Sequence, residues 1–125
     1  MLDMARVNAL RAVLKETWKQ ADTYGKFMSR VSQKDPEATP ANEPPPIANS
    51  ATESIEKEVN IIAAGAGITT HEQHLWEPER TFMDKWATNT GAPRNKSAEG
   101  LADYYRGVAA WLDKTDKYLI YLTNK

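Results

Sequence analysis

Two groups of side chains in this sequence have types and spacings that could bind a ligand. One is a run of basic residues near the N-terminus, and the other is a short cluster of histidine and glutamate. On a helix of about 100° per residue, the basic residues cover a single arc of about 100°. Such an arc could bind a polyanion, most simply the phosphates of a nucleic acid. This basic series consists of Arg11, Lys15, Lys19, Lys26 and Arg30.

The basic series would not stabilise an isolated helix. Three pairs of its members carry the same charge four residues apart, and each pair costs roughly 0.2–0.5 kcal/mol. Only Asp22, four residues before Lys26, offers local compensation. The pattern favours an anionic partner outside the helix, against the alternative of a solvated face that only keeps the helix soluble. The acidic residues within 35–79 could also be that partner, in the same chain or on a neighbour.

The second group invites a metal-binding interpretation, because imidazole and carboxylate ligands lie within two helical turns. Its members are His71, Glu72, His74 and Glu77. Their spacing matches neither His-Glu-x-x-His nor the Glu-x-x-His of di-iron bundles, and no other cluster supplies further ligands. We interpret them as surface or interface side chains and predict no metal site.

The sequence offers no catalytic constellation. Gly65 and Gly67 match only the start of a dinucleotide-binding loop, because the preceding segment reads as a helix and the third glycine is absent. There is no cysteine, no serine elbow, no phosphate loop and no pair of carboxylates in an apolar setting. We predict that the protein is not an enzyme and has no catalytic residues, no cofactor and no small-molecule substrate.

The charges divide sharply along the chain, although the formal net charge is only -1. Residues 1–34 carry seven basic and three acidic groups, residues 35–79 carry one and nine, and residues 80–125 carry eight and five. The first segment therefore has the sign that attracts polyanions, whatever the isoelectric point of the whole chain.

The length of 125 residues allows one domain at most, with a core of modest size drawn from 41% hydrophobic residues. The first residues lack the apolar core of a signal peptide. The longest apolar run, 61–68, is far shorter than the ~20 residues that span a bilayer. We expect a soluble chain without a transmembrane segment, made and used inside a cell or built into a particle there.

The elements that must position these residues read as helices separated by proline and glycine. Residues 2–32 keep a 3.6-residue apolar pattern without proline, which predicts a helix of ~45 Å. Its buried face, opposite the basic series, contains Val7, Leu10, Leu14, Trp18, Ala21 and Met28. Five prolines within 35–49 predict a polyproline-like connector.

Further helices are predicted after the connector. A capping box at Ser50 and Glu53 predicts a helix up to Gly65, and a second box at Thr70 predicts another helix that breaks over 88–95. The last helix is predicted over 98–123. Its apolar face is broad and combines two rows, the first with Leu101, Tyr105, Val108, Leu112, Thr115, Leu119 and Leu122, the second with Tyr104, Trp111 and Tyr118.

No segment alternates with a period of two, so the predicted fold class is all-α. We divide the chain into a basic N-terminal helix at 1–34, a proline-rich connector at 35–49 and a C-terminal helical bundle at 50–125. The long first helix and the broad last helix are not expected to bury both apolar faces within one short chain. Exposed apolar faces favour association, so we expect an obligate oligomer.

The layout of basic helix, proline connector and helical C-terminal part resembles the major coat proteins of filamentous and rod-shaped archaeal viruses. Local similarities are Ala66-Gly67-Ile68-Thr69 before a helix, then Gly91-Ala92-Pro93, and Tyr104-Tyr105 in the last helix. In that family an N-terminal arm wraps double-stranded DNA held in A-form, while C-terminal helices build the outer wall.

This resemblance implies a virion coat protein, assembled in the host cytoplasm, that binds double-stranded DNA without sequence specificity and forms a helical filament. Subunits would pair as homodimers or as heterodimers with a related coat protein. The DNA-facing residues would be Arg6, Arg11, Lys15, Lys19, Lys26 and Arg30. Two alternatives are a helical interaction subunit of a multiprotein complex without nucleic acid, and a small enzyme or metal protein that uses His71 and His74. The host, the type of nucleic acid and the helical symmetry stay open.

Overall fold

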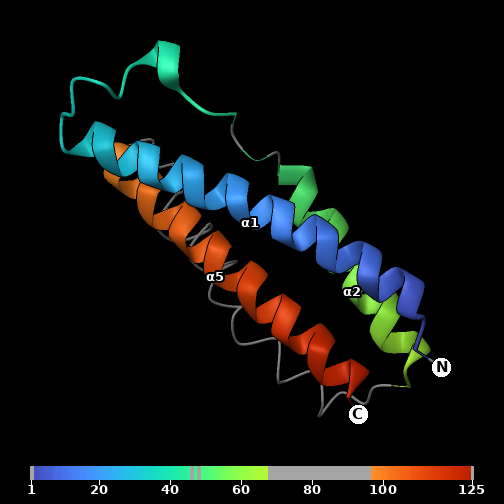
Figure 1. The fold of residues 1–125 in the computed structure, drawn as a ribbon. Coiled ribbons are helices and arrows are strands. Elements are labelled where there is room, and N and C mark those ends of the chain that lie inside the picture. The colour runs from blue at the N-terminus through green and yellow to red at the C-terminus, as the bar shows by residue number, and fades with distance from the viewer. Residues whose placement is uncertain (1, 46, 48, 68–96, 125) are drawn as a thin grey trace.

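The computed structural model describes residues 2–45, 47, 49–67 and 97–124 (Figure 1). Within these ranges the protein is all-α, as predicted, and contains no strand. The described elements are α1 Met4–Ser32, the short 3-10 helix η1 Pro40–Asn42, α2 Asn49–Gly65 and α5 Ala98–Thr123. α1 begins and α5 ends at the same end of the molecule (Figure 1).

α1 confirms the predicted N-terminal helix, and local contacts fix both of its ends. The Asp3 carboxylate accepts a hydrogen bond of 3.2 Å from the Arg6 backbone N–H, which caps the first turn. At the other end, two backbone hydrogen bonds of 3.0 Å close a Schellman arrangement. Lys34 occupies the left-handed position of this arrangement, at φ 59°.

α5 packs antiparallel along α1 (Figure 1). It begins at Ala98 and ends at Thr123, as predicted, and the Ser97 hydroxyl caps its first turn by accepting a 3.1 Å hydrogen bond from the Gly100 N–H. The two helices approach closely at Gly25, where an added Cβ would lie 3.4 Å from the Cβ of Tyr105. A glycine in the middle of α1 therefore marks close contact with α5.

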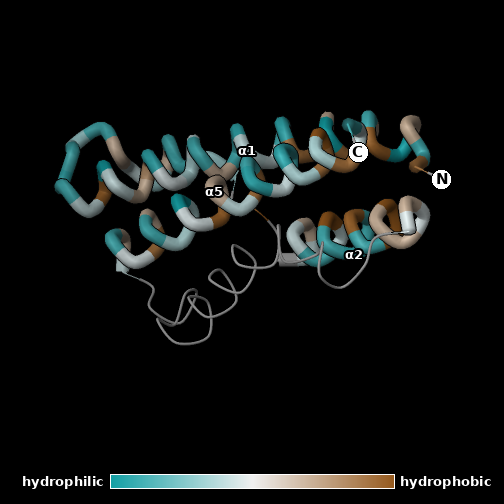
Figure 2. Tube along the Cα trace, turned by 90° about the horizontal axis from the view of Figure 1, so that it is seen from below, coloured by the Kyte–Doolittle hydropathy of each residue, from teal (hydrophilic) through white to brown (hydrophobic). Residues whose placement is uncertain are grey.

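One hydrophobic core contains residues from α1, α2 and α5. Trp111 and Leu112 of α5 are each 1% exposed, and Leu119 is 0% exposed. Figure 2 shows hydrophobic residues recurring along each helix. The expectation that the long first helix and the broad last helix could not both bury their apolar faces within one chain is wrong, because they bury them against each other. Self-association remains a prediction that needs another argument.

The buried face of α1 differs from the prediction at one turn. Thr17 is only 6% exposed, whereas Trp18 is 41% exposed. Thr17 can be buried because its hydroxyl donates a 2.8 Å hydrogen bond to the Val13 carbonyl oxygen. Trp18 is consequently part of the molecular surface.

α2 lies beside the N-terminal half of α1 (Figures 1 and 2). Its Ile55, Val59 and Ile62 belong to the shared core. The helix begins at Asn49, so Ser50 lies within the first turn and not at the predicted cap. After α2 the chain turns as predicted, with Gly67 at φ 69°.

The connector between α1 and α2 is not extended throughout, because η1 makes one tight turn within it. The Tyr24 hydroxyl of α1 donates a 2.9 Å hydrogen bond to the Glu43 carboxylate and so ties the connector down. Burial of the Tyr24 phenol, together with the nearby Glu43 carboxylate, raises the pKa of Tyr24 to about 12.

Three predicted features lie outside the described residues: the capping box at Thr70, the break over 88–95 and the histidine and glutamate cluster from His71 to Glu77. No helix in the described ranges is long and apolar enough to cross a membrane.

Candidate interface on the first helix

The six basic residues expected to face DNA are all exposed on α1. They are Arg6, Arg11, Lys15, Lys19, Lys26 and Arg30. Four of them have a carboxylate within ion-pair distance in the same chain. The six residues therefore share a helix and a charge, but they do not share one environment.

Arg11 contacts α5. Its guanidinium donates from Nε to Oδ1 of Asp116 at 2.7 Å and from Nη2 to Oδ2 at 3.4 Å. This forked contact joins residues 105 positions apart and is consistent with the antiparallel register in which α1 and α5 share their core. The hydrogen bond to Asp116 raises the pKa of Arg11 further, so the guanidinium is always charged.

Arg6 and Arg30 contact the acidic middle of the chain. Arg6 lies 3.5 Å from the Glu58 carboxylate of α2. Arg30 lies 2.8 Å from Asp35 and 3.6 Å from Glu37, both in the connector. The hydrogen bond from Arg30 holds the pKa of Asp35 below its ordinary value. The alternative that acidic residues of the same chain serve as partners is thus confirmed for these two arginines.

The three lysines behave differently from the arginines. Lys26 lies 2.9 Å from Asp22, the local pair that the sequence indicated. Lys15 and Lys19 form no ion pair within the part of the chain that the structure describes. They are therefore the cations of this helix that are most available to an external partner.

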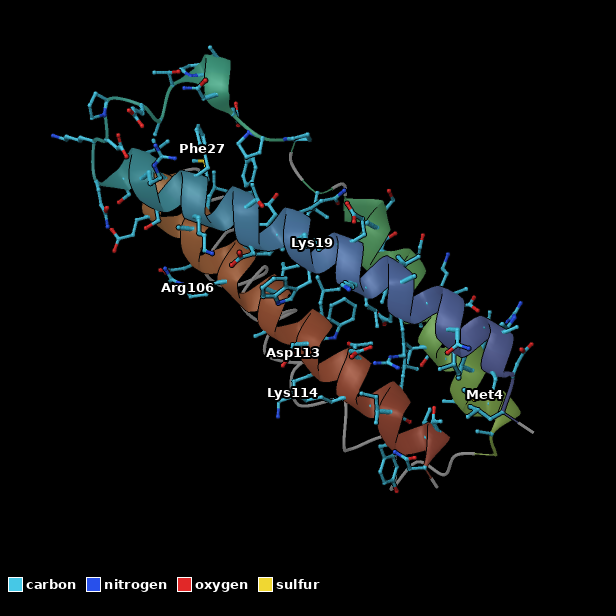
Figure 3. The ribbon with its side chains drawn as sticks, in the orientation of Figure 1. Met4, Lys19, Phe27, Arg106, Asp113 and Lys114 are labelled. Carbon is cyan, nitrogen blue, oxygen red and sulfur yellow. The ribbon has the colours of Figure 1, made fainter. Side chains whose placement is uncertain are left out.

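Lys15 and Lys19 border a hollow between α1 and α5, which we call the Trp18 groove. Its volume is about 430 Å³. Figure 3 shows Lys19 on α1 and Asp113 on α5, the two helices that form it. The groove is lined by Arg11, Ala12, Leu14, Lys15, Trp18 and Lys19 of α1 and by Leu112, Asp113 and Asp116 of α5.

The lining of the Trp18 groove combines an apolar floor with charged borders. Leu14 and Leu112 are buried, and the exposed indole of Trp18 stands beside them. The basic borders come from α1 and the acidic borders come from α5. The sequence did not predict this groove. Thr17 and Trp18 lie at opposite edges of the apolar stripe that was predicted for α1, and the position of α5 determines which of the two side chains is buried.

A second hollow of about 360 Å³ lies between α1 and α2. It is more apolar and includes Val13, which is 48% exposed, with Arg6 and Glu58 paired at its side. Neither hollow contains a metal-binding cluster, since no group of three potential ligands occurs among the described residues.

Comparison with known proteins gives no relative: no family model, no curated protein and no solved structure matches this chain.

Proposed function

We propose that this protein is a structural subunit that assembles with other protein chains through the Trp18 groove. The observation that carries the proposal is the 41% exposed Trp18 indole, which stands over a groove with charged borders. Tryptophan is the residue type most enriched among the anchors of protein interfaces, where it combines a large apolar area with few rotatable bonds. A charged border around an apolar centre is the usual layout of such an interface.

The charges of the groove favour a protein over a nucleic acid at this position. Asp113 and Asp116 line it beside the lysines, and carboxylates repel phosphates. Arg11, the strongest potential phosphate ligand there, already holds Asp116 in a forked contact. A protein surface that carries both acidic and basic side chains can pair with the basic border from α1 and with the acidic border from α5.

A variant with a smaller side chain at the centre of the groove tests this function. Trp18→Ala removes the exposed 41% of the side chain together with some packing against α1 and α5, so its folding is checked first by circular dichroism. The folded variant should assemble at least tenfold more weakly, roughly the effect of losing one interface anchor. Ile61→Ala is the matched control, because Ile61 is 49% exposed but lies on α2. Sedimentation velocity measures both. Equal assembly of Trp18→Ala and the unmodified chain would contradict the role of the groove.

The second candidate is the DNA-binding coat subunit implied by the resemblance to archaeal viral coat proteins. One observation favours it: α1 carries six basic and two acidic residues, and Lys15 and Lys19 form no ion pair among the described residues. Exposed ion pairs are worth only about 0–1 kcal/mol, so phosphates could replace the carboxylates at Arg6, Lys26 and Arg30. Binding of this kind would be independent of sequence and would weaken steeply with salt.

Salt dependence separates the two candidates. Replacement of Lys15, Lys19 and Lys26 by glutamine should flatten the plot of log affinity for double-stranded DNA against log salt by roughly 0.9 per lost phosphate contact. If the slope does not change, the lysines act on protein partners. Purified assemblies with the absorbance ratio of pure protein would remove the DNA candidate, and electron microscopy would show whether they are filaments.

A further inference from the structure

The charges that border the Trp18 groove are separated by helix. Among the residues that line the groove, Arg11, Lys15 and Lys19 come from α1, whereas Asp113 and Asp116 come from α5. Asp113 also lies 3.0 Å from Lys117 of its own helix, in an exposed pair that is worth only about 0–1 kcal/mol and that another cation can replace. The 2.7 Å contact between Arg11 and Asp116 puts these two residues at the same height along the antiparallel helices. In an antiparallel pair, residue numbers rise along one helix while they fall along the other. Lys15 therefore lies level with Asp113 to within one residue.

We propose that the occupant of the Trp18 groove is a second copy of this chain, related to the first by a two-fold axis parallel to α1 and α5. This inference rests on the proposed assembly function and names its partner. Such an axis exchanges the two helices but keeps the height of every residue, so α1 of one copy lies over α5 of the other. Lys15 of each copy then faces Asp113 of the other, and the two Trp18 side chains meet near the axis.

A two-fold axis perpendicular to the helices gives the opposite result. It places α1 over α1 and α5 over α5, so that the basic borders of the two grooves face each other and the acidic borders face each other. Like charges that face each other across an interface strongly destabilise that dimer. Charge complementarity therefore selects the axis parallel to the helices.

The face formed by α1 and α5 is large enough for a stable dimer. The helices have 29 and 26 residues. At about 1.5 Å per residue and about 10 Å for each helix diameter, the face measures about 40 by 20 Å. That is about 800 Å² on each copy, the area that one partner contributes to an interface of standard size.

Charge reversal at one contact tests the arrangement. In a dimer of Lys15→Glu, two carboxylates meet at both symmetry-related contacts, and in a dimer of Asp113→Lys two cations meet. Each variant alone should dimerise roughly a hundredfold more weakly, about tenfold for each of the two contacts. A mixture of the two variants restores opposite charges at both contacts, so a heterodimer should form with the affinity of the unmodified chain. Sedimentation equilibrium distinguishes the 14.0 kDa chain from its dimer.

Two variants on α2 serve as matched controls. Lys57→Glu and Glu53→Lys change the net charge by the same amounts at exposed positions away from the groove, so each should dimerise normally. Rescue that occurs only in the mixture of the two groove variants supports the two-fold contact. If the unmodified chain assembles but the mixture is no tighter than either variant, the assembly function stands and the two-fold arrangement is wrong. An unmodified chain that stays monomeric at every concentration overturns both.

Discussion

Gly25 allows a sharp test of how closely α1 and α5 pack. It lies in the middle of a helix, where glycine is about 1 kcal/mol less favourable than alanine. An added methyl group would lie 3.4 Å from the Tyr105 Cβ, 3.8 Å from the Ala102 carbonyl oxygen and 3.9 Å from the Arg106 nitrogen, all ordinary van der Waals contacts. Gly25→Ala should therefore raise the free energy of unfolding by about 0.5–1 kcal/mol, because it gains helix propensity and meets no clash.

Gly25→Val supplies the contrast. Its two methyl groups extend beyond the Cβ into the backbone of α5, which cannot move aside as a flexible side chain would. Overpacking of this kind costs about 1–3 kcal/mol, so the variant should be less stable than the unmodified chain. The two substitutions therefore have effects of opposite sign at one position.

Urea and thermal unfolding followed by circular dichroism measure both variants. For a chain of this size, 1 kcal/mol corresponds to a shift of about 3–5 °C in Tm. A loss of stability in Gly25→Ala would show that the helices pack closer than the structure has them. A gain in Gly25→Val would show that they do not pack closely there.

The remaining predictions concern a helix end, a buried phenol and the core. Lys34→Gly should stabilise the fold by about 0.5–1 kcal/mol in urea unfolding, because glycine adopts the left-handed conformation without strain. The folded state raises the pKa of Tyr24 to about 12. The free energy of unfolding should therefore stay constant up to pH ~10 and fall by roughly 2 kcal/mol as the pH rises toward 12. Tyr24→Phe should show a smaller fall over the same pH range. Leu119→Ala should cost about 3–4 kcal/mol, since Leu119 is 0% exposed.

The ends of the long helices could be predicted from sequence because local contacts determine them. Ser97 caps α5 through the N–H of Gly100, three residues away, and the apolar pattern behind it continues to Thr123. α1 starts after Asp3, whose carboxylate accepts from the Arg6 N–H, so it begins two residues later than the predicted start at residue 2. Such signals lie within one turn of the helix, so a single sequence contains them.

The candidate site could be predicted only in part, because it depends on contacts between distant residues. The basic arc and its exposure follow from helical spacing alone. The partner of Arg11 does not, since Asp116 lies 105 residues away and only the antiparallel register of α1 and α5 brings it near. The exposure of Trp18 has the same origin, because the position of α5 decides which edge of the apolar stripe is covered.

Residue chemistry explains why the basic helix has two kinds of cation. Its three arginines all contact carboxylates from other segments, and the rigid guanidinium fork suits such contacts. Its lysines contact a residue of the same helix, at Lys26, or form no ion pair among the described residues, at Lys15 and Lys19. Arginine substitutions should therefore lower the free energy of unfolding slightly, by about 0–1 kcal/mol for each exposed ion pair that is lost. Lysine substitutions should leave folding unchanged and act on whatever the exposed edge of α1 binds.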